Sequence, residues 1–329
     1  MKRIFKVLLI LVLILVVAGG AGLGYLFIAF PKTDPVPDIK VDMSAANVAK
    51  GKYLANHVML CMDCHGQRDF SLFSGPPKPG TEGAGGDRFD GTMGFPGVFY
   101  ARNITPASLK DWTDGELLRL LTTGVTKHNE VIFPVMPYRN YAKCDPEDLK
   151  AIIAYLRTVP AVEVENKPSK ADFPLNILLR TMAAVPQPAK RPDTTDLVKY
   201  GQYIANAAAC NECHTAVDEK GEFTGIMYSG GRSFQFPDGT ILTSPNITPH
   251  KQNGIGNWTE EYFVQRFKMH SDSANRARKV QPGEMQSIMP WVMYSGMDTT
   301  DLRSIYAFLK SLDPVDNAVV KIKPPLAKN

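Results

Sequence analysis

The sequence predicts an all-α protein in which two tandem helical domains follow an N-terminal transmembrane helix. Three observations lead to this prediction. A charge-free apolar run opens the chain, a long segment of sequence occurs twice after it, and apolar residues recur at helical spacing without a convincing alternating strand pattern. The 329 residues are enough for an anchor and two domains of ordinary size.

The apolar run comprises residues 7–30 and follows Lys2, Arg3 and Lys6. As a helix it is about 36 Å long, which is enough to cross the hydrocarbon core of a bilayer. The basic residues before it predict a cytoplasmic N-terminus and an exported remainder. Small residues at 18–22 leave a cleaved signal peptide as the alternative, but the apolar run continues beyond them, which favours an uncleaved single-pass anchor.

The formal net charge of +4 comes mostly from this N-terminal cluster, so the exported part is almost neutral. That balance gives no argument for nucleic acid or an anionic membrane surface as a partner. Four of the five cysteines fall in two short motifs. Cys144 is left over, and we expect it to be a buried thiol without a function.

The two motifs read Cys-Met-Asp-Cys-His at residues 61–65 and Cys-Asn-Glu-Cys-His at residues 210–214. The C-x-x-C-H pattern is typical of covalent haem attachment, because two thiols bond the haem vinyl groups and the histidine ligates iron. A redox pair or half of a zinc site is the alternative for either motif alone. The sequence therefore predicts two covalently bound haem c groups, held by Cys61, Cys64 and His65 and by Cys210, Cys213 and His214.

Both motifs lie within a duplicated unit rather than a repeat array. The recurring segments are residues 51–56, 85–89, 103–106, 112–113, 135–138 and 145–149 in the first copy, and 201–206, 230–234, 246–249, 258–259, 288–291 and 298–302 in the second. The predicted organisation is a signal-anchor helix at 1–30, a tether at 31–43, domain 1 at 44–160, a linker at 161–195, domain 2 at 196–313 and a tail at 314–329. Within the linker, residues 173–185 are expected to form a short helix or a strap against a domain.

Capping signals support the helical prediction. Thr113 and Glu116 have the spacing of a capping box, and Asp145 is a predicted N-cap followed by proline. The Gly- and Pro-rich segments 74–97 and 221–245 are expected to be loops.

Gly51 and Gly201 lie inside the helices that lead into the two motifs. Glycine in a helix costs about 1 kcal/mol relative to alanine. We therefore expect a close helix crossing at each glycine, with Tyr155 and Phe308 lying on them.

Met136 and Met289 are the predicted distal iron ligands. Each is followed by proline, each precedes a terminal helix, and the two occupy matched positions in the copies. A thioether ligand favours reduced iron, and the proline fixes the loop that presents it. The alternatives are Met93 or His128 for the first haem and Met285, His250 or His270 for the second. These three histidines have no partner in the other copy, so we expect them at the surface.

The haem propionates need hydrogen-bond donors. Arg102, Asn103 and Asn246 are candidates, together with the indoles of Trp112 and Trp258. A loop-building role for the asparagines and a core role for the tryptophans fit the sequence equally well.

Together these residues resemble the class I cytochrome c fold and, more closely, the dihaem or trihaem cytochrome c subunits of membrane-bound bacterial alcohol and gluconate dehydrogenases. The resemblance covers about residues 45–312. It rests on the C-x-x-C-H motifs, the two Asn-Ile-Thr-Pro segments, residues 254–259 and both Met-Pro pairs. It implies two tandem class I cytochrome c domains that take electrons from a catalytic dehydrogenase subunit and pass them to quinone or another carrier. The chain departs from these subunits in having two haem motifs rather than three and in the N-terminal place of its apolar segment.

The predicted function is electron transfer by a dihaem cytochrome c, anchored in a bacterial inner membrane with its haem domains in the periplasm. Its expected partners are a dehydrogenase or quinol-side donor and a terminal oxidase or other cytochrome as acceptor, and no catalytic residue is expected. The alternative is a haem-dependent enzyme, such as a dihaem peroxidase or a thiosulfate-oxidising cytochrome. Cys144 lies near Met136 in the sequence and could act as the cysteine ligand of a sulfur-oxidising haem site, so this alternative is retained.

Overall fold

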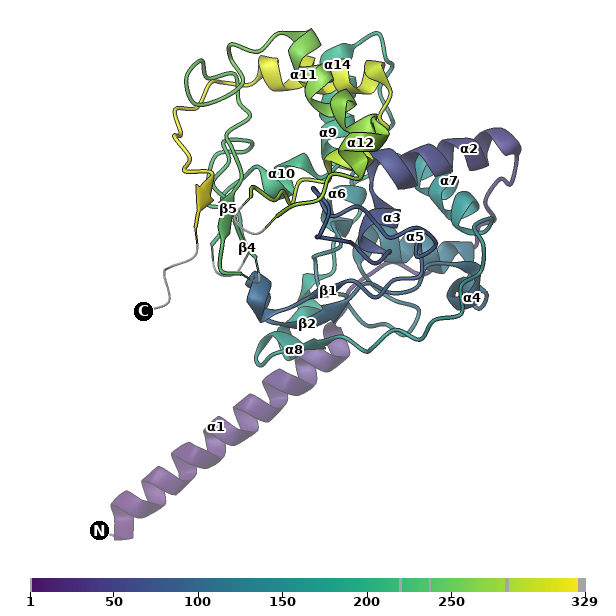
Figure 1. The fold of residues 1–329 in the computed structure, drawn as a ribbon. Helices are drawn as coiled ribbons and strands as arrows, with labels where there is room; N and C mark the ends of the chain where they lie inside the picture. Colours follow the sequence, from purple (N-terminus) through teal and green to yellow (C-terminus); the bar gives the residue numbers. More distant parts are fainter. Residues whose placement is uncertain (1, 219–220, 237, 282–283, 325–329) are drawn as a thin grey trace.

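A computed structural model describes residues 2–218, 221–236, 238–281 and 284–324 of the chain. Helix α1 (Lys2–Ala29) projects from the remainder as a single rod and buries none of its residues (Figure 1). An 18-residue window within it has a mean hydropathy of 2.8, and it is the one helix in the described ranges that is long and apolar enough to cross a membrane. Its length and composition fit a membrane anchor or a signal sequence.

Two helical halves follow α1. The helices of the first half are α2 (Ala45–Tyr53), α3 (Cys61–Cys64), α4 (Pro106–Leu109), α5 (Asp114–Thr123), α6 (Tyr138–Tyr141) and α7 (Pro146–Leu156), with a π-helical turn η1 (Leu54–Val58) after α2 and a 3₁₀ turn η2 (Gly91–Met93). The helices of the second half are α9 (Leu197–Ala207), α10 (Cys210–Cys213), α11 (Glu260–Lys268), α12 (Ser273–Arg276), α13 (Trp291–Tyr294) and α14 (Thr299–Ser311), with a 3₁₀ turn η4 (Met269–Ser271) after α11. The expected caps are present, since Thr113 and Glu116 form the full capping box at the start of α5 and Asp145 caps α7.

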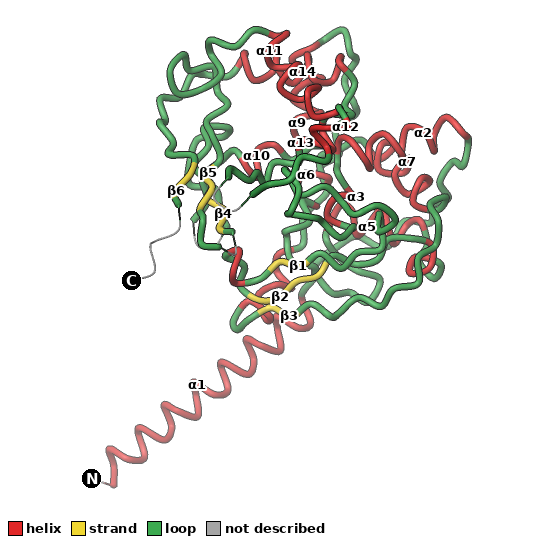
Figure 2. Tube along the Cα trace, in the orientation of Figure 1, coloured by secondary structure: helices red, strands yellow, loops and turns green. Residues whose placement is uncertain are grey.

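The all-α prediction is right for the helices but missed short strands in the loops. The described chain contains two three-stranded antiparallel sheets, β1 (Arg88–Phe89), β2 (Gly97–Tyr100) and β3 (Lys170–Ala171), and β4 (Ser233–Gln235), β5 (Ile241–Thr243) and β6 (Ile322–Lys323) (Figure 2). The longest of them, β2, has four residues. Strands this short leave too little alternation for a sequence pattern to reveal.

Both sheets take their third strand from the segment that follows a terminal helix. After β3 the chain forms α8 (Leu175–Leu178) and the 3₁₀ turn η3 (Leu179–Met182). This segment is held on the first half by hydrogen bonds from the Tyr138 hydroxyl to the Met182 carbonyl (3.0 Å) and from the Ala184 amide to the Thr123 carbonyl (2.9 Å). The expectation of a packed strap at 173–185 is confirmed. Residues 325–329 of the expected tail lie outside the described residues.

The two helix crossings expected at glycines are present. A Cβ atom added to Gly51 would lie 1.8 Å from the carbonyl oxygen of Ala151 in α7, and one added to Gly201 would lie 1.8 Å from that of Ser304 in α14. The nearest atoms at both glycines belong to the backbone of the crossing helix, not to the rings of Tyr155 and Phe308. Each crossing is therefore closer than expected, with backbone against backbone.

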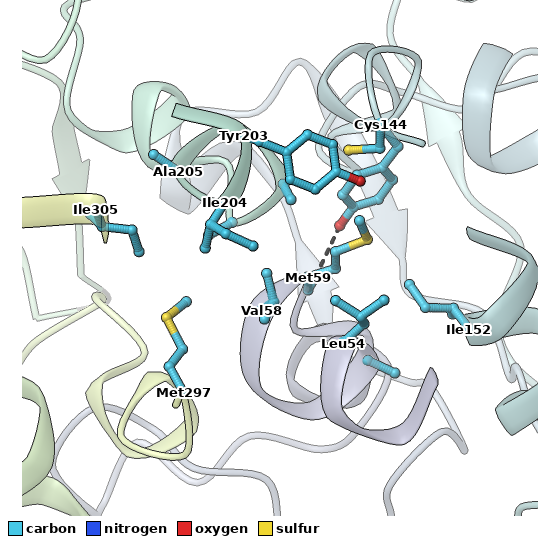
Figure 3. Close-up of a cluster of buried hydrophobic side chains, with 14 of the residues drawn as sticks. Leu54, Val58, Met59, Cys144, Ile152, Tyr203, Ile204, Ala205, Met297 and Ile305 are labelled. Atoms are coloured by element: carbon cyan, nitrogen blue, oxygen red, sulfur yellow. Dashed lines mark hydrogen bonds between the residues drawn. The ribbon is translucent and has the colours of Figure 1, made fainter. Parts of the chain in front are cut away.

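The buried apolar side chains of the described residues include a cluster that draws on both halves. Figure 3 shows Val58 of the first half between Leu54 of its own half and Ile204 and Met297 of the second. Because these side chains are at most 1% exposed, the halves share a core and do not only touch at their surfaces.

Two reciprocal hydrogen bonds also join the halves. The Tyr53 hydroxyl donates to Asp301 at 2.5 Å, and the Tyr203 hydroxyl donates to Asp148 at 2.7 Å. Each tyrosine thus reaches from its own half to the aspartate of the other. Both aspartates are buried, at 4% and 0% exposure, so these bonds satisfy acceptors that water does not reach.

Candidate haem-binding sites

The two C-x-x-C-H motifs have the same local conformation. Each begins with a single helical turn, α3 or α10, preceded by a residue in the left-handed region, Leu60 or Ala209, both at φ 53°. For a residue with a side chain this conformation costs roughly 1–2 kcal/mol. The turn places the two cysteines of each motif three residues apart on one helical face. The same strained entry in both copies therefore presents both pairs of thiols in the same way.

The histidine of each motif is held by a backbone carbonyl. His65 Nδ1 donates to the Arg102 carbonyl oxygen at 2.6 Å, and His214 Nδ1 donates to the Pro245 carbonyl oxygen at 2.8 Å. A carbonyl only accepts, so the proton is on Nδ1 and the lone pair of Nε2 remains available. Burial lowers the pKa of both imidazoles and keeps them neutral. A neutral imidazole oriented through its other nitrogen is the usual state of a metal-ligating histidine.

Matched glycines allow those carbonyls to approach. The Gly85 amide donates to the His65 carbonyl at 2.9 Å, and the Gly230 amide donates to the His214 carbonyl at 2.8 Å. Their φ angles are +74° and +78°, and a Cβ atom at either would lie 2.5 Å from a backbone carbon of the segment that orients the histidine. Only glycine fits these positions, so the loop and the histidine are positioned together.

The predicted distal methionines lie in loops of the same shape. The Met136 carbonyl accepts the Tyr138 amide at 2.8 Å, and the Met289 carbonyl accepts the Trp291 amide at 2.8 Å. A short helix begins directly after the proline in each copy. Both methionines are partly buried against the core cluster that also contacts Cys61 and Cys210.

These features fit a haem c at each motif. The two thiols of each motif lie on one helical turn, and the adjacent imidazole has an available Nε2. Burial raises the pKa of Cys61 and Cys210 to about 12, so the sites favour uncharged sulfur. A thioether is uncharged, whereas a metal-bound thiolate is not.

No family model matches the sequence. Curated relatives do match most of the chain. The cytochrome c subunit of a quinone-dependent alcohol dehydrogenase from Gluconobacter oxydans is 24% identical over 83% of the chain and 56% of its own length. A dihaem c-type cytochrome from Cereibacter sphaeroides is 28% identical over 78% of the chain and 83% of its own length. The gluconate 2-dehydrogenase cytochrome c subunit of Pantoea cypripedii is 26% identical over 82% of the chain.

The chain is similar to cytochrome c subunits of dehydrogenases. It spans 56% of the length of the alcohol dehydrogenase subunit and 60% of the gluconate dehydrogenase subunit. The cytochrome c relatives agree with the haem chemistry that the motif geometry fits, and one of them is named as a dihaem protein.

The asparagines offered as propionate donors build the loops instead. The Asn103 amide donates to the Val162 carbonyl and the Asn246 amide donates to the Val315 carbonyl, both at 2.7 Å. Their side-chain oxygens accept the backbone and side chain of the threonine two residues later. The loop-building interpretation therefore describes both asparagines. These bonds tie the Asn-Ile-Thr-Pro segment to the chain that follows each terminal helix.

The other candidate donors to the propionates are two tryptophans and an arginine, which differ in their exposure. Trp112 and Trp258 are partly buried against the core, which is the core role considered above. Arg102 is exposed and has no counterpart in the second half, where Pro245 precedes Asn246. Arg102 is thus the candidate that remains for a propionate, and only at the first haem.

The residues considered as alternative distal ligands differ in how exposed they are. His128 is exposed, as expected, and Met285 is 54% exposed. Met93 is partly buried in the 3₁₀ turn η2. His250 is partly buried, and its Nδ1 accepts the Asn253 amide at 3.1 Å.

The expectation that His270 lies at the surface is wrong. It is 7% exposed, and its ring stacks on Phe73 of the first half at 5.7 Å. No described residue bonds either ring nitrogen. Burial, together with Arg266 and Arg278, lowers its pKa. Its burial arises because a loop of the first half, which includes Phe73, covers the turn η4, and no pattern in the sequence indicates this contact.

Two matched tyrosines support the methionine loops, and sequence reasoning missed both. The Tyr141 hydroxyl donates to the Met59 carbonyl at 3.0 Å, and the Tyr294 hydroxyl donates to the Ala208 carbonyl at 2.7 Å. Each tyrosine follows its methionine by five residues, a spacing that the repeat contains. Burial raises the pKa of both, so they stay neutral donors. They connect the distal loop of each half to the residues just before its own C-x-x-C-H motif.

Each methionine loop also contacts the other half. Asn140, four residues after Met136, donates from its amide to the Asn211 side-chain oxygen at 2.7 Å, and Asn211 lies inside the second motif. In the other direction, the Ser74 hydroxyl of the first half donates to the Met289 carbonyl at 2.6 Å. The two candidate sites are therefore linked by direct hydrogen bonds.

Cys144 is buried as expected. It is 1% exposed, and its Sγ lies 3.6 Å from the Asn140 carbonyl oxygen. Burial raises its pKa to about 12, so the thiol is neutral. Within the described ranges, no group of three or more His, Cys, Asp and Glu side chains is placed to hold a metal ion, so the two cysteine pairs do not meet there as a four-ligand zinc site.

Proposed function

We propose that the chain is a membrane-anchored dihaem cytochrome c that transfers electrons between a dehydrogenase or quinol-side donor and a downstream acceptor. The observation that carries this proposal is the carbonyl-held histidine of each motif, with its Nε2 available beside two thiols on one helical turn. The similarity to dehydrogenase cytochrome c subunits supports the same function.

The residues that would hold the haems repeat between the halves. Thioether bonds would form at Cys61 and Cys64 and at Cys210 and Cys213, with His65 and His214 as proximal ligands and Met136 and Met289 as distal ligands. When bound, haem c supplies reversible one-electron chemistry. The protein positions the ligands, excludes water with the shared core and orients each imidazole through its Nδ1 proton. Two tandem class I cytochrome c domains, at 44–160 and 196–313, account for the matched elements.

The links between the halves suit electron transfer from one haem to the other. The Met136 loop contacts the second motif through Asn140, and the Met289 loop is held by Ser74 of the first half. Both contacts are hydrogen bonds inside one packed assembly, so they fix the relative position of the sites. Outer-sphere transfer between two haems is favoured when their relative position is fixed.

A carrier fits the two sites better than an enzyme does. The Met-Pro loops have the same backbone hydrogen bond and the same supporting tyrosine in both halves. A catalytic haem would need one distal position to differ, so that substrate reaches the iron. Cys144, the candidate for a sulfur-oxidising site, is buried and neutral. We therefore prefer electron transfer to a dihaem peroxidase or a thiosulfate-oxidising cytochrome.

The proposed location is a bacterial inner membrane, crossed once by α1, with the haem domains in the periplasm. The apolar length of α1 and the basic residues at its start support this topology. The proposed partners are a dehydrogenase subunit on the donor side and a terminal oxidase or another cytochrome on the acceptor side.

Intact-mass measurement of the purified protein tests the cofactor proposal. The mass should exceed that of the polypeptide by two haems, and denaturation should not release them. The variant Cys213→Ala should remain coloured with the second haem bound through one thioether. A colourless protein at the polypeptide mass would contradict the proposal.

A turnover assay tests the carrier proposal. The reduced protein is mixed with peroxide, and the oxidised protein is separately offered thiosulfate. Slow, non-saturating oxidation or reduction is expected. Saturable turnover of either compound at about one per second or faster would show an enzyme instead.

A further inference from the structure

The strap that follows β3 contacts the end of α1. The Arg180 guanidinium donates to the Phe30 carbonyl oxygen at 2.7 and 3.1 Å, and to that of Phe27 at 3.4 Å. It also lies 5.0 Å from the centre of the Phe27 ring. Carbonyls at the C-terminal end of a helix have no partner within the helix, and a cation there is favourable. Arg180 therefore caps α1 and fixes the strap against it.

The strap exposes apolar side chains beside this cap. Phe173 is 79% exposed and Leu178 is 46% exposed, on either side of the start of α8. In Figure 1, α8 lies at the end of the molecule from which α1 departs. These side chains thus continue the apolar surface of α1 onto the part of the protein that follows the anchor.

The length of α1 determines the depth of this apolar surface relative to the bilayer. From Val7 to Leu26, roughly 20 residues give about 30 Å of helix, which matches the hydrocarbon core of a bilayer. Phe27 and Phe30 then lie at the level of the lipid headgroups, and so does Arg180. Arginine reaches that level with its charged end, and apolar side chains such as phenylalanine and leucine bury at the boundary between headgroups and acyl chains.

We propose that Phe173 and Leu178 insert into the periplasmic boundary of the bilayer and hold the haem-binding halves at a fixed orientation to it. The inference rests on the proposed function in one respect, that α1 stays in the membrane. The strap contains one charged residue, Arg180, whose guanidinium is engaged by α1, and its neighbours Lys170 and Asp172 have opposite signs. We therefore expect apolar contact to drive insertion, also into neutral phosphatidylcholine.

Photocrosslinking of the full-length protein in phosphatidylcholine vesicles tests the proposal. The photoreactive amino acid p-benzoylphenylalanine replaces Phe173 in one variant, Leu15 within α1 in a second and Tyr262 in a third. Tyr262 is the matched control, because it is an aromatic residue that is 50% exposed on α11, at the end of the molecule away from α1 (Figure 1). The intact mass after irradiation reports a bound phospholipid, and the visible haem spectrum reports folding.

We expect a phospholipid adduct at positions 15 and 173, with at least a tenfold lower yield at 262. An adduct at 15 without one at 173 would overturn the proposal while leaving the anchor and the haem chemistry intact. Equal yields at 173 and 262 would also overturn it, because contact would then be unspecific. An absence of adducts at 15 would overturn both the anchor and the insertion that depends on it.

A second variant tests the part played by Arg180. In the protein with the photoreactive residue at 173, Arg180→Gln removes the bonds to α1 and should lower the adduct yield several-fold. Arg303→Gln, on an exposed arginine paired with Glu260, is the control and should leave the yield unchanged. An unchanged yield with Arg180→Gln would contradict the capping role.

Discussion

The amide of Asn140 donates a 2.7 Å hydrogen bond to the side-chain oxygen of Asn211, although one follows the proposed ligand of the first haem and the other lies in the attachment motif of the second. The Asn206 amide in turn donates to the Asn140 carbonyl at 3.0 Å. A change at this contact should therefore affect both haems, even though it alters no ligand.

Asn140→Leu should test this connection. The substitution removes the bond from the buried Asn140 amide to the partly buried Asn211 side chain, and the loss of such a hydrogen bond costs about 0.5–1.5 kcal/mol. We expect lower stability towards urea, monitored by haem absorbance, and a changed reduction potential for the second haem. Gln202→Leu, an uncharged substitution at an exposed position of α9, is the control. A second-haem potential equal to that of the unmodified protein would argue against coupling through Asn140.

The distal ligands are tested by Met136→Ala and Met289→Ala. Each variant should lose about half of the weak far-red band that arises from sulfur bound to oxidised iron. One of the two reduction potentials should fall in each, because a thioether stabilises reduced iron. Met285→Ala, at an exposed methionine, should change neither quantity. A full far-red band in both ligand variants would exclude this assignment.

The reciprocal tyrosines predict a second stability effect. Tyr53→Phe and Tyr203→Phe each remove a donor from a buried carboxylate, and we expect a loss of about 1.5–3 kcal/mol in the free energy of unfolding for each. The two hydroxyls also accept the Asp298 and Asp145 amides, at 2.9 and 3.0 Å, which adds to the cost. Chemical denaturation measures the effect, with Tyr262→Phe at an exposed site as control. Losses below about 0.5 kcal/mol would mean that the bonds contribute little.

At the two helix crossings, we expect replacement of glycine by alanine to lower stability, which is the opposite of what helix propensity alone predicts. Alanine is favoured over glycine in a helix by about 1 kcal/mol, yet Gly51→Ala and Gly201→Ala would each place a Cβ atom 1.8 Å from a backbone oxygen. We expect a net loss of at least about 2 kcal/mol, or failure to accumulate folded protein. Thermal unfolding and yield measure this. Gly91→Ala, where no atom lies within 4 Å, is the control. Stabilisation by either helix substitution would contradict the close crossings.

His270 predicts a dependence of stability on pH. Burial, Arg266 and Arg278 lower its pKa in the folded protein, whereas the unfolded chain titrates near 6.5. Below about pH 6.5 the unfolded state therefore binds more protons, so stability is fully present above this pH and falls as the pH drops towards the folded pKa. His57 shifts in the same direction, so the wild type alone does not isolate His270.

The comparison of pH 7.5 with pH 5.5 isolates His270. His270→Phe keeps a stacking ring beside Phe73 and should reduce the difference in unfolding free energy between the two pH values. His128→Phe, at an exposed histidine, should leave the difference as in the wild type. An undiminished difference in His270→Phe would show that another group is responsible.

Local features of the molecule were open to prediction because they are encoded in short segments. The capping box at Thr113 and the proline after Met136 each define a conformation within a few residues. Contacts between distant segments were not open to prediction, apart from the helix crossings that Gly51 and Gly201 mark because glycine is otherwise unfavourable within a helix. Tyr53 and Asp301 each recur in both copies, but the repeat does not say whether a tyrosine meets the aspartate of its own half or of the other. The short strands and the burial of His270 depend on the same kind of long-range contact.

The exchange of hydrogen bonds between Tyr53 and Asp301 and between Tyr203 and Asp148 has a bearing on ancestry. A contact in which residue i meets j and j meets i is isologous, the kind that closes a symmetric homodimer. A single-copy ancestor with this tyrosine and this aspartate would make both bonds with a second copy of itself. The two copies differ at the position occupied by Asn140 in one half and Met293 in the other. Within one covalent chain, the halves thus meet through the reciprocal type of contact that otherwise joins the subunits of a symmetric dimer.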